Sequence, residues 1–213
     1  MDLSVVHAYI NSGLGIRPEP RQFRRAAVGP LLLVLLMGII PGCVLGKGWL
    51  VLSIVMVVSA TILFVVILGL SRRNMSVENR LIMQAIIYSN WVSQVILIQV
   101  MYYTMAWGVD LTLVLICIMP IVVPLIIGLR NSRSLRYQEK YTARATKNSQ
   151  AAMFFGWTGV VGACVGKHFF SNVSNSVAIV FVIISLTMMA CVFSFGLLAY
   201  QRLYYLKKYV TRS

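Results

Sequence analysis

Acidic residues are scarce in this chain. Its 213 residues include five Asp and Glu against 19 Lys and Arg, which gives a formal charge of +14. Proton relays and cation-coupled carriers use ionisable side chains inside the membrane. The five acids instead lie outside the apolar segments or at their edges, at Asp2, Glu19, Glu78, Asp110 and Glu139. The sequence therefore disfavours a carrier that couples itself to an ion gradient.

Catalytic and metal-binding patterns are also missing from the sequence. There is no HExxH, GxSxG or P-loop motif. The two histidines, His7 and His168, fall on opposite sides of the predicted topology, so they cannot share a metal ion. The four cysteines form no CxxC pair and lie within apolar segments, which is typical of free thiols. We predict no enzyme activity, no catalytic residues, no metal site and no cofactor.

Charged residues of either sign are few, at 11% of the chain, while 59% of residues are hydrophobic and mean hydropathy is +0.84. A soluble domain carries about 25% charged residues. A charge of +14 could indicate nucleic-acid binding in a soluble protein. Here the cations lie in short loops between apolar runs, where they orient the chain and contact anionic lipid headgroups. We therefore predict an all-α integral membrane protein that binds no nucleic acid.

Long apolar runs dominate what is present. Six segments approach the roughly 20 residues that span a bilayer, and they occupy 28–46, 49–70, 85–106, 109–129, 151–167 and 177–200. Short links join them in pairs, which predicts three helical hairpins. A cytoplasmic segment over 1–27, with a short interfacial helix near Leu3–Ile10, precedes this transmembrane domain of 28–200. A basic cytoplasmic tail of 201–213 follows it.

The distribution of Lys and Arg predicts the orientation. Four lie in 1–27, three in 71–84, six in 130–150 and four in the tail, whereas the opposite side receives only Lys47 and Lys167. Basic loops stay in the cytoplasm. The sequence therefore predicts a multi-pass protein of the plasma membrane with both termini in the cytoplasm.

The third predicted span is the most polar. At about 100° per residue, Trp91, Gln99 and Tyr102 share one arc, and Asn90 and Gln94 share another. Amides are costly in hydrocarbon unless they are hydrogen-bonded, so this helix should face protein or water on most sides. Two interpretations remain open: bonds that only hold helices together, or a polar cavity that binds a solute or partner. Trp157, on the fifth span, is a further candidate for the aromatic wall of such a cavity.

The fifth predicted span carries small residues along one face, at Gly156, Gly159, Ala163 and Gly166. Small side chains let helix backbones approach closely. We expect this face to pack against a neighbouring helix or a second copy of the chain, as in a homo-oligomer. A substrate passage along the glycines is the alternative.

These features favour the membrane-spanning subunit of a transporter that is energised by a partner protein, either an ATPase or another membrane subunit. Small size and few carboxylates support a subunit over a self-sufficient carrier. One alternative is an immunity or accessory protein that recognises another membrane polypeptide through the third and fifth spans. A membrane module that binds a small solute is the other.

Overall fold

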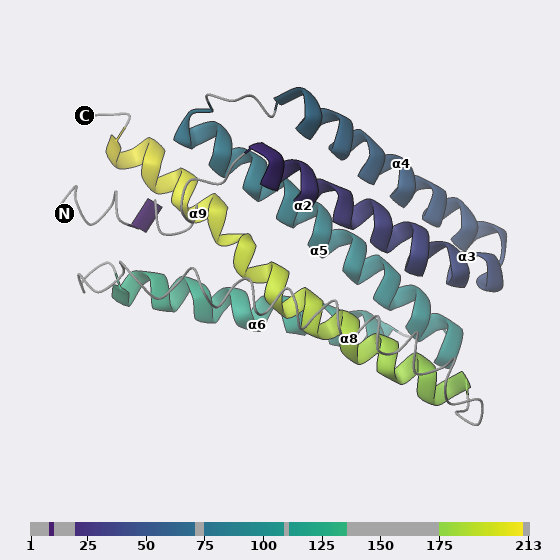
Figure 1. Ribbon diagram of the computed structural model, residues 1–213. Helices are drawn as coiled ribbons and strands as arrows, with labels where there is room; N and C mark the ends of the chain where they lie inside the picture. Colours follow the sequence, from purple (N-terminus) through teal and green to yellow (C-terminus); the bar gives the residue numbers. More distant parts are fainter. Residues whose placement is uncertain (1–8, 11–19, 71–74, 109–110, 136–174, 211–213) are drawn as a thin grey trace.

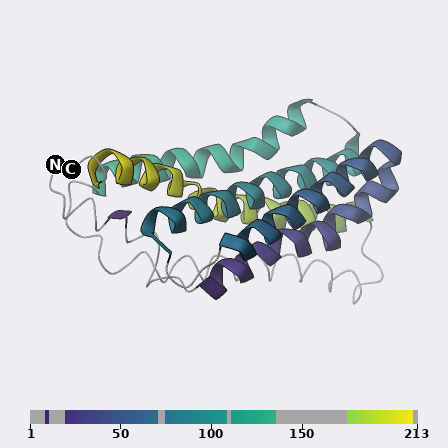
Figure 2. The same ribbon diagram turned by 90° about the horizontal axis from the view of Figure 1, so that it is seen from above.

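The computed structural model describes residues 9–10, 20–70, 75–108, 111–135 and 175–210. Within these ranges the chain is all-helical and has no strand. Its elements are α2 (Pro20–Leu33), the π-helical turn η1 (Val34–Gly38), α3 (Ile39–Leu45), α4 (Lys47–Leu70), α5 (Val77–Trp107), α6 (Leu111–Leu135), α8 (Asn175–Gly196), α9 (Leu198–Tyr205) and the π-helical turn η2 (Leu206–Val210). The helices run roughly alongside one another as an elongated bundle (Figures 1 and 2).

Four stretches are long and apolar enough to cross a membrane: Phe23–Leu45, Lys47–Leu70, Val77–Trp107 and Val177–Tyr209. The region Ile121–Arg130 of α6 forms a shorter apolar helix. This is the pattern of a multi-pass helical membrane protein. The predicted fifth span, 151–167, lies outside the described residues.

The helices extend beyond the apolar windows at several ends. The third begins at Val77, eight residues before the predicted start, because Ser76 caps it by accepting a hydrogen bond from the Asn79 backbone N–H at 3.2 Å. Glu78 lies in the first turn, where a carboxylate is favourable. The last predicted span continues past residue 200 through α9 and η2. Polar residues thus prolong helices that hydropathy alone would end early.

Two glycines reverse the chain between helices. Gly46 (φ 101°) separates α3 from α4, and Gly108 (φ 84°) ends α5 and donates its N–H to the Thr104 carbonyl at 2.9 Å. Both φ angles are positive, in a region that glycine adopts without steric cost. The first hairpin can therefore turn within one residue.

α4 illustrates how each helix divides between the bundle and its surroundings. Its buried residues recur every three or four positions: Ser53, Met56, Ala60, Leu63 and Ile67. The opposite face is apolar and exposed, at Val51, Ile54, Val55, Val58, Ile62, Val65 and Val66. A helix that is apolar all round is suited to lipid on its outer face.

The main core lies where α2, η1, α4, α5 and α8 meet, and α5 contributes the longest series of buried residues to it. A smaller cluster joins Tyr9 and Ile10 to Leu81 of α5 and Tyr205 of α9. Tyr9 and Ile10 are helical and buried, within the stretch predicted as an interfacial helix.

At one end of the bundle α2 and α5 begin, and α4, α6 and α9 end (Figure 1). Apart from Lys47, the charged residues of these helices lie near those helix ends in the sequence. We call this end of the bundle the basic end. Lys47 lies at the opposite end, at the start of α4. The charged residues whose side chains the structure describes at the basic end are Arg24, Arg25, Glu78, Arg80, Arg130, Arg202, Lys207 and Lys208.

Candidate functional site

The central helix, α5, carries the polar residues that the sequence singles out. It contacts α2, α3, α4, α6, α8 and α9. Trp91, Gln94, Gln99 and Tyr102 are all buried, and Asn90 is half-buried. The two arcs of the helix face different neighbours, since Gln94 points to α4 and Gln99 to α8.

Gln94 links α5 to α4. Its Nε2 donates to the Ser59 hydroxyl at 2.8 Å and lies 3.3 Å from the Met56 carbonyl. The Ser59 hydroxyl in turn donates to the Met56 carbonyl at 2.8 Å. Gln94 is 2% exposed, so these bonds satisfy its donor in the interior.

Gln99 links α5 to α8 on the other side. This residue is fully buried, and its Nε2 donates to the Thr187 hydroxyl at 2.6 Å. The Thr187 hydroxyl donates to the Ile183 carbonyl one turn earlier, at 2.8 Å. Gln94 and Gln99 thus attach opposite sides of α5 to different helices.

In both glutamines the amide nitrogen is hydrogen-bonded, whereas, within the described part of the chain, the amide oxygen is not. Gln94 Oε1 and Gln99 Oε1 are buried and accept no hydrogen bond from the residues that the structure describes, and the same holds for Asn90 Oδ1. A buried polar atom without a partner costs about 1–3 kcal/mol. Such atoms are few in native proteins and each requires an explanation. Asn90 and Gln94 are one turn apart on the same face of α5, and Gln99 places its oxygen on the other side of the helix.

The Trp91 ring packs against α2 at Gly29. Pro30 has no N–H, so the Ala26 carbonyl four residues earlier lacks its helical donor. The Trp91 indole Nε1 donates to this carbonyl at 3.1 Å. Gly29 leaves the necessary space, because a Cβ there would lie 2.0 Å from Trp91 Cζ2. Trp91 therefore supplies the bond that the proline removes.

An aromatic stack continues from Trp91 into α8. Phe193 stacks on the indole at 4.4 Å between ring centroids. The Tyr88 ring lies 6.2 Å from the Phe193 ring. A Cβ at Gly196 would lie 2.1 Å from Tyr88 Cγ, so this glycine admits the tyrosine ring. The stack joins α2, α5 and α8 below the two glutamines, toward the basic end.

Asn90, Trp91, Gln94, Gln99 and Tyr102 all lie on α5, but they do not share one surface, because Gln94 faces α4 and Gln99 faces α8. Trp157 and the small-residue face of Gly156, Gly159, Ala163 and Gly166 lie outside the described residues, so those predictions stay predictions. Ser59, Thr187 and Phe193 were not selected from the sequence. A hydroxyl within an apolar span is the available sequence signal for Ser59 and Thr187, and other residues of the same spans share it.

Within the described residues no group of three or more His, Cys, Asp or Glu side chains is arranged to hold a metal ion. The side chains of the site are amides, hydroxyls and aromatic rings. They can exchange hydrogen bonds with a donor-bearing group and stack on a planar one. Comparison of the chain with protein-family models, curated proteins and solved structures finds no match.

Proposed function

We propose that this chain is the membrane-spanning subunit of a transporter and that a separate protein energises it. The observation that carries the proposal is the pair of buried glutamines on α5. The amide oxygen of each accepts no hydrogen bond from the described residues. A solute with N–H or O–H donors would satisfy these oxygens. Because the glutamines attach α5 to α4 and α8, binding there would change how the helices hold one another.

Two irregular turns beside α5 support movement of the bundle. The π-helical turn η1 lies between Pro30 and Pro41 in the first span, and π turns are frequent at functional sites. In the last span, α8 and α9 are separated at Leu197, whose N–H bonds to the Ser194 carbonyl at 3.1 Å. Transporters often build their binding sites beside interrupted helices.

The proposal includes six spans in the plasma membrane with both termini in the cytoplasm. α6 ends at the basic end, whereas α8 begins at the opposite end (Figure 1). This placement supports a further crossing between them, where the sequence predicts the span 151–167. Positive charge at the basic end favours a cytoplasmic location for that end.

Copurification tests the proposed assembly. The tagged full chain, extracted from its own membranes in a mild detergent, should retain a protein that hydrolyses ATP, and ATPase activity should elute with the chain. A retained membrane polypeptide without hydrolase activity would instead support the immunity or accessory alternative. A bound small molecule without any protein would support the solute-binding module.

Matched variants test the glutamine site in that assembly. Gln94→Met and Gln99→Met keep the side-chain length and remove the amide, whereas Ser93→Leu changes an exposed polar residue on the same helix. Losing one interhelical bond should cost about 0.6 kcal/mol of stability. If the amides bind solute, the glutamine variants should lose most solute-stimulated ATPase activity per folded molecule. Activity equal to that of Ser93→Leu would limit both glutamines to holding the helices together.

A further inference from the structure

Along α8, α9 and η2 the exposed residues change from apolar to aromatic and then to cationic toward the basic end. On the exposed surface of this segment, apolar Ile184, Met188 and Phe195 are followed by Tyr200 and Tyr204, which are 49% and 57% exposed, and then by the exposed lysines Lys207 and Lys208. Apolar, aromatic and cationic residues in this order match the hydrocarbon, interfacial and headgroup layers of a bilayer. The helix therefore presents its lysines at the level of lipid headgroups.

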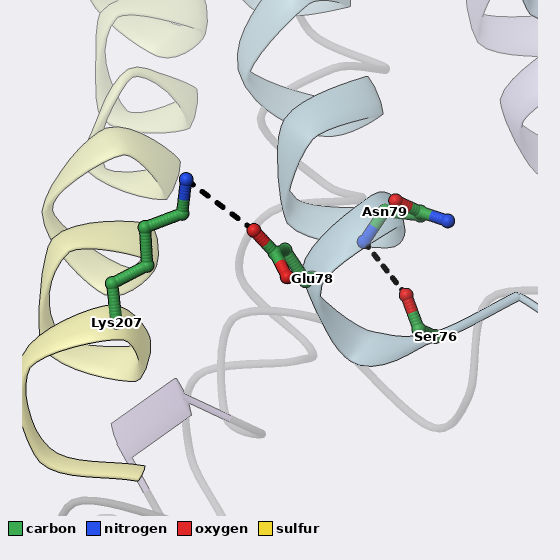
Figure 3. A network of polar contacts seen from close by, with 4 residues as sticks. All are labelled: Ser76, Glu78, Asn79 and Lys207. Carbon is green, nitrogen blue, oxygen red and sulfur yellow. Dashed lines mark hydrogen bonds and ion pairs between the residues drawn. The ribbon is translucent and has the colours of Figure 1, made fainter. Parts of the chain in front are cut away.

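The cations of this segment have different partners. Lys207 Nζ lies 3.3 Å from Glu78 Oε1 at the start of α5 (Figure 3). The Arg202 guanidinium lies over the Tyr9 ring at 5.6 Å from its centroid. Lys207 is thus opposed by a carboxylate. Its charge is partly compensated before any ligand arrives.

Lys208 is held by aromatic rings. Its Nζ lies 5.6 Å from the Tyr204 ring centroid and 5.4 Å from that of Tyr209. Tyr205 stacks on Tyr209 at 5.9 Å and meets Tyr204 edge-on at 5.5 Å, which supports both rings. A cation over an aromatic face is attracted to it but keeps its full charge. Lys208 is therefore an exposed and positioned cation.

We propose that Lys208, between Tyr204 and Tyr209, binds the phosphate of an anionic phospholipid. The ammonium supplies the charge, the tyrosine rings fix its position, and Arg24, Arg25 and Arg130 add positive potential at the same end of the bundle. The neighbouring apolar surface of α8 accommodates acyl chains. This site is separate from the glutamines of α5 and does not depend on the transport proposal.

Native mass spectrometry of the full chain in detergent measures the binding, with phosphatidylglycerol and phosphatidylcholine as probes. The unchanged protein should bind phosphatidylglycerol more tightly. Lys208→Gln should weaken phosphatidylglycerol binding about fivefold, as expected for one cation at an anionic surface. Its phosphatidylcholine binding should not change. Lys47→Gln is the matched control, since it removes one exposed cation at the opposite end.

Equal losses in Lys208→Gln and Lys47→Gln would overturn the site and leave only an effect of net charge. Inorganic phosphate that competes fully with phosphatidylglycerol would indicate a site for free anions and overturn the lipid assignment. If Lys208→Gln keeps its lipid binding but loses a copurifying acidic protein, the surface is a protein interface instead.

The aromatic support has its own test. Tyr204→Phe retains the ring beneath Lys208, whereas Tyr204→Ala removes it. Phosphatidylglycerol binding should be nearly preserved in Tyr204→Phe and reduced in Tyr204→Ala. Unchanged binding in Tyr204→Ala would show that the ring does not position the lysine.

Discussion

At the scale of single residues, Trp91 shows how a side chain can supply a hydrogen bond that the backbone of another helix lacks. Proline within a helix leaves one carbonyl without its donor, and in hydrocarbon that carbonyl has no water to bond. The Trp91 indole reaches the Ala26 carbonyl across a distance of 65 residues in sequence. The glycine beside Pro30 allows the ring to come this close. Trp91 and the distant Gly29–Pro30 pair thus act as one structural unit.

Gly29→Ala tests this unit. The added methyl would lie 2.0 Å from Trp91 Cζ2, and the indole is a rigid ring with Phe193 stacked on it. We expect the change to cost about 1–3 kcal/mol of stability, the usual range for overpacking, measured by thermal unfolding in detergent. Gly69→Ala is the control, because a Cβ there meets nothing within 4 Å. Equal stability of the two variants would show that Trp91 does not pack closely against Gly29.

At the scale of whole elements, the first hairpin depends on close contact between α3 and α4. The Ser53 hydroxyl lies 3.0 Å from both the Gly38 and Trp49 carbonyls, so it bonds within α4 and across to η1. A Cβ at Gly42 would lie 2.2 Å from this hydroxyl. Small residues at helix contacts permit such approaches in membranes. The hairpin is therefore joined by a polar bond from Ser53 to Gly38, one turn away from the close approach at Gly42.

A double-mutant cycle on Gly42 and Ser53 tests that contact. Gly42→Ala should destabilise the protein by about 1–3 kcal/mol because the methyl meets the hydroxyl. Ser53→Ala removes the hydroxyl and should reduce the cost of Gly42→Ala by about 0.5 kcal/mol or more. Thermal unfolding of both single variants and the double variant supplies the coupling. Strictly additive losses would show that the two residues do not meet.

At the scale of the molecule, the two ends of the bundle differ in charge. The basic end holds nearly all the charged side chains that the structure describes, and the opposite end holds Lys47 and the aromatic residues Trp49, Tyr103 and Trp107. Loops rich in Lys and Arg are retained in the cytoplasm. We therefore predict that the basic end lies in the cytoplasm.

Cysteine labelling in whole cells measures this orientation. The background is a chain whose native cysteines are replaced. Ser76→Cys, at the basic end, should react with an impermeant reagent only after the cells are opened. Gly48→Cys, where a Cβ meets nothing within 4 Å, should react from outside. Labelling of Ser76→Cys in intact cells would reverse the topology.

The sequence by itself determined the helical, membrane-embedded class of this protein. A 24-residue run such as Lys47–Leu70 contains no acid and cannot fold as a soluble helix without exposing apolar surface. Its hydropathy therefore identifies the span without any knowledge of neighbours. The polarity of the third span also indicated that Gln94 and Gln99 need partners, because an unpaired amide in hydrocarbon is costly.

The tertiary structure alone decided who those partners are. Gln94 meets Ser59 and Gln99 meets Thr187, at sequence separations of 35 and 88 residues, and each partner lies in a span with several other polar residues. Trp91 meets a carbonyl that belongs to no side chain at all. Apolar helices share the same hydropathy on every face, so the sequence carries little record of which faces meet. That choice is made by close packing and by hydrogen bonds that exist only once the helices are side by side.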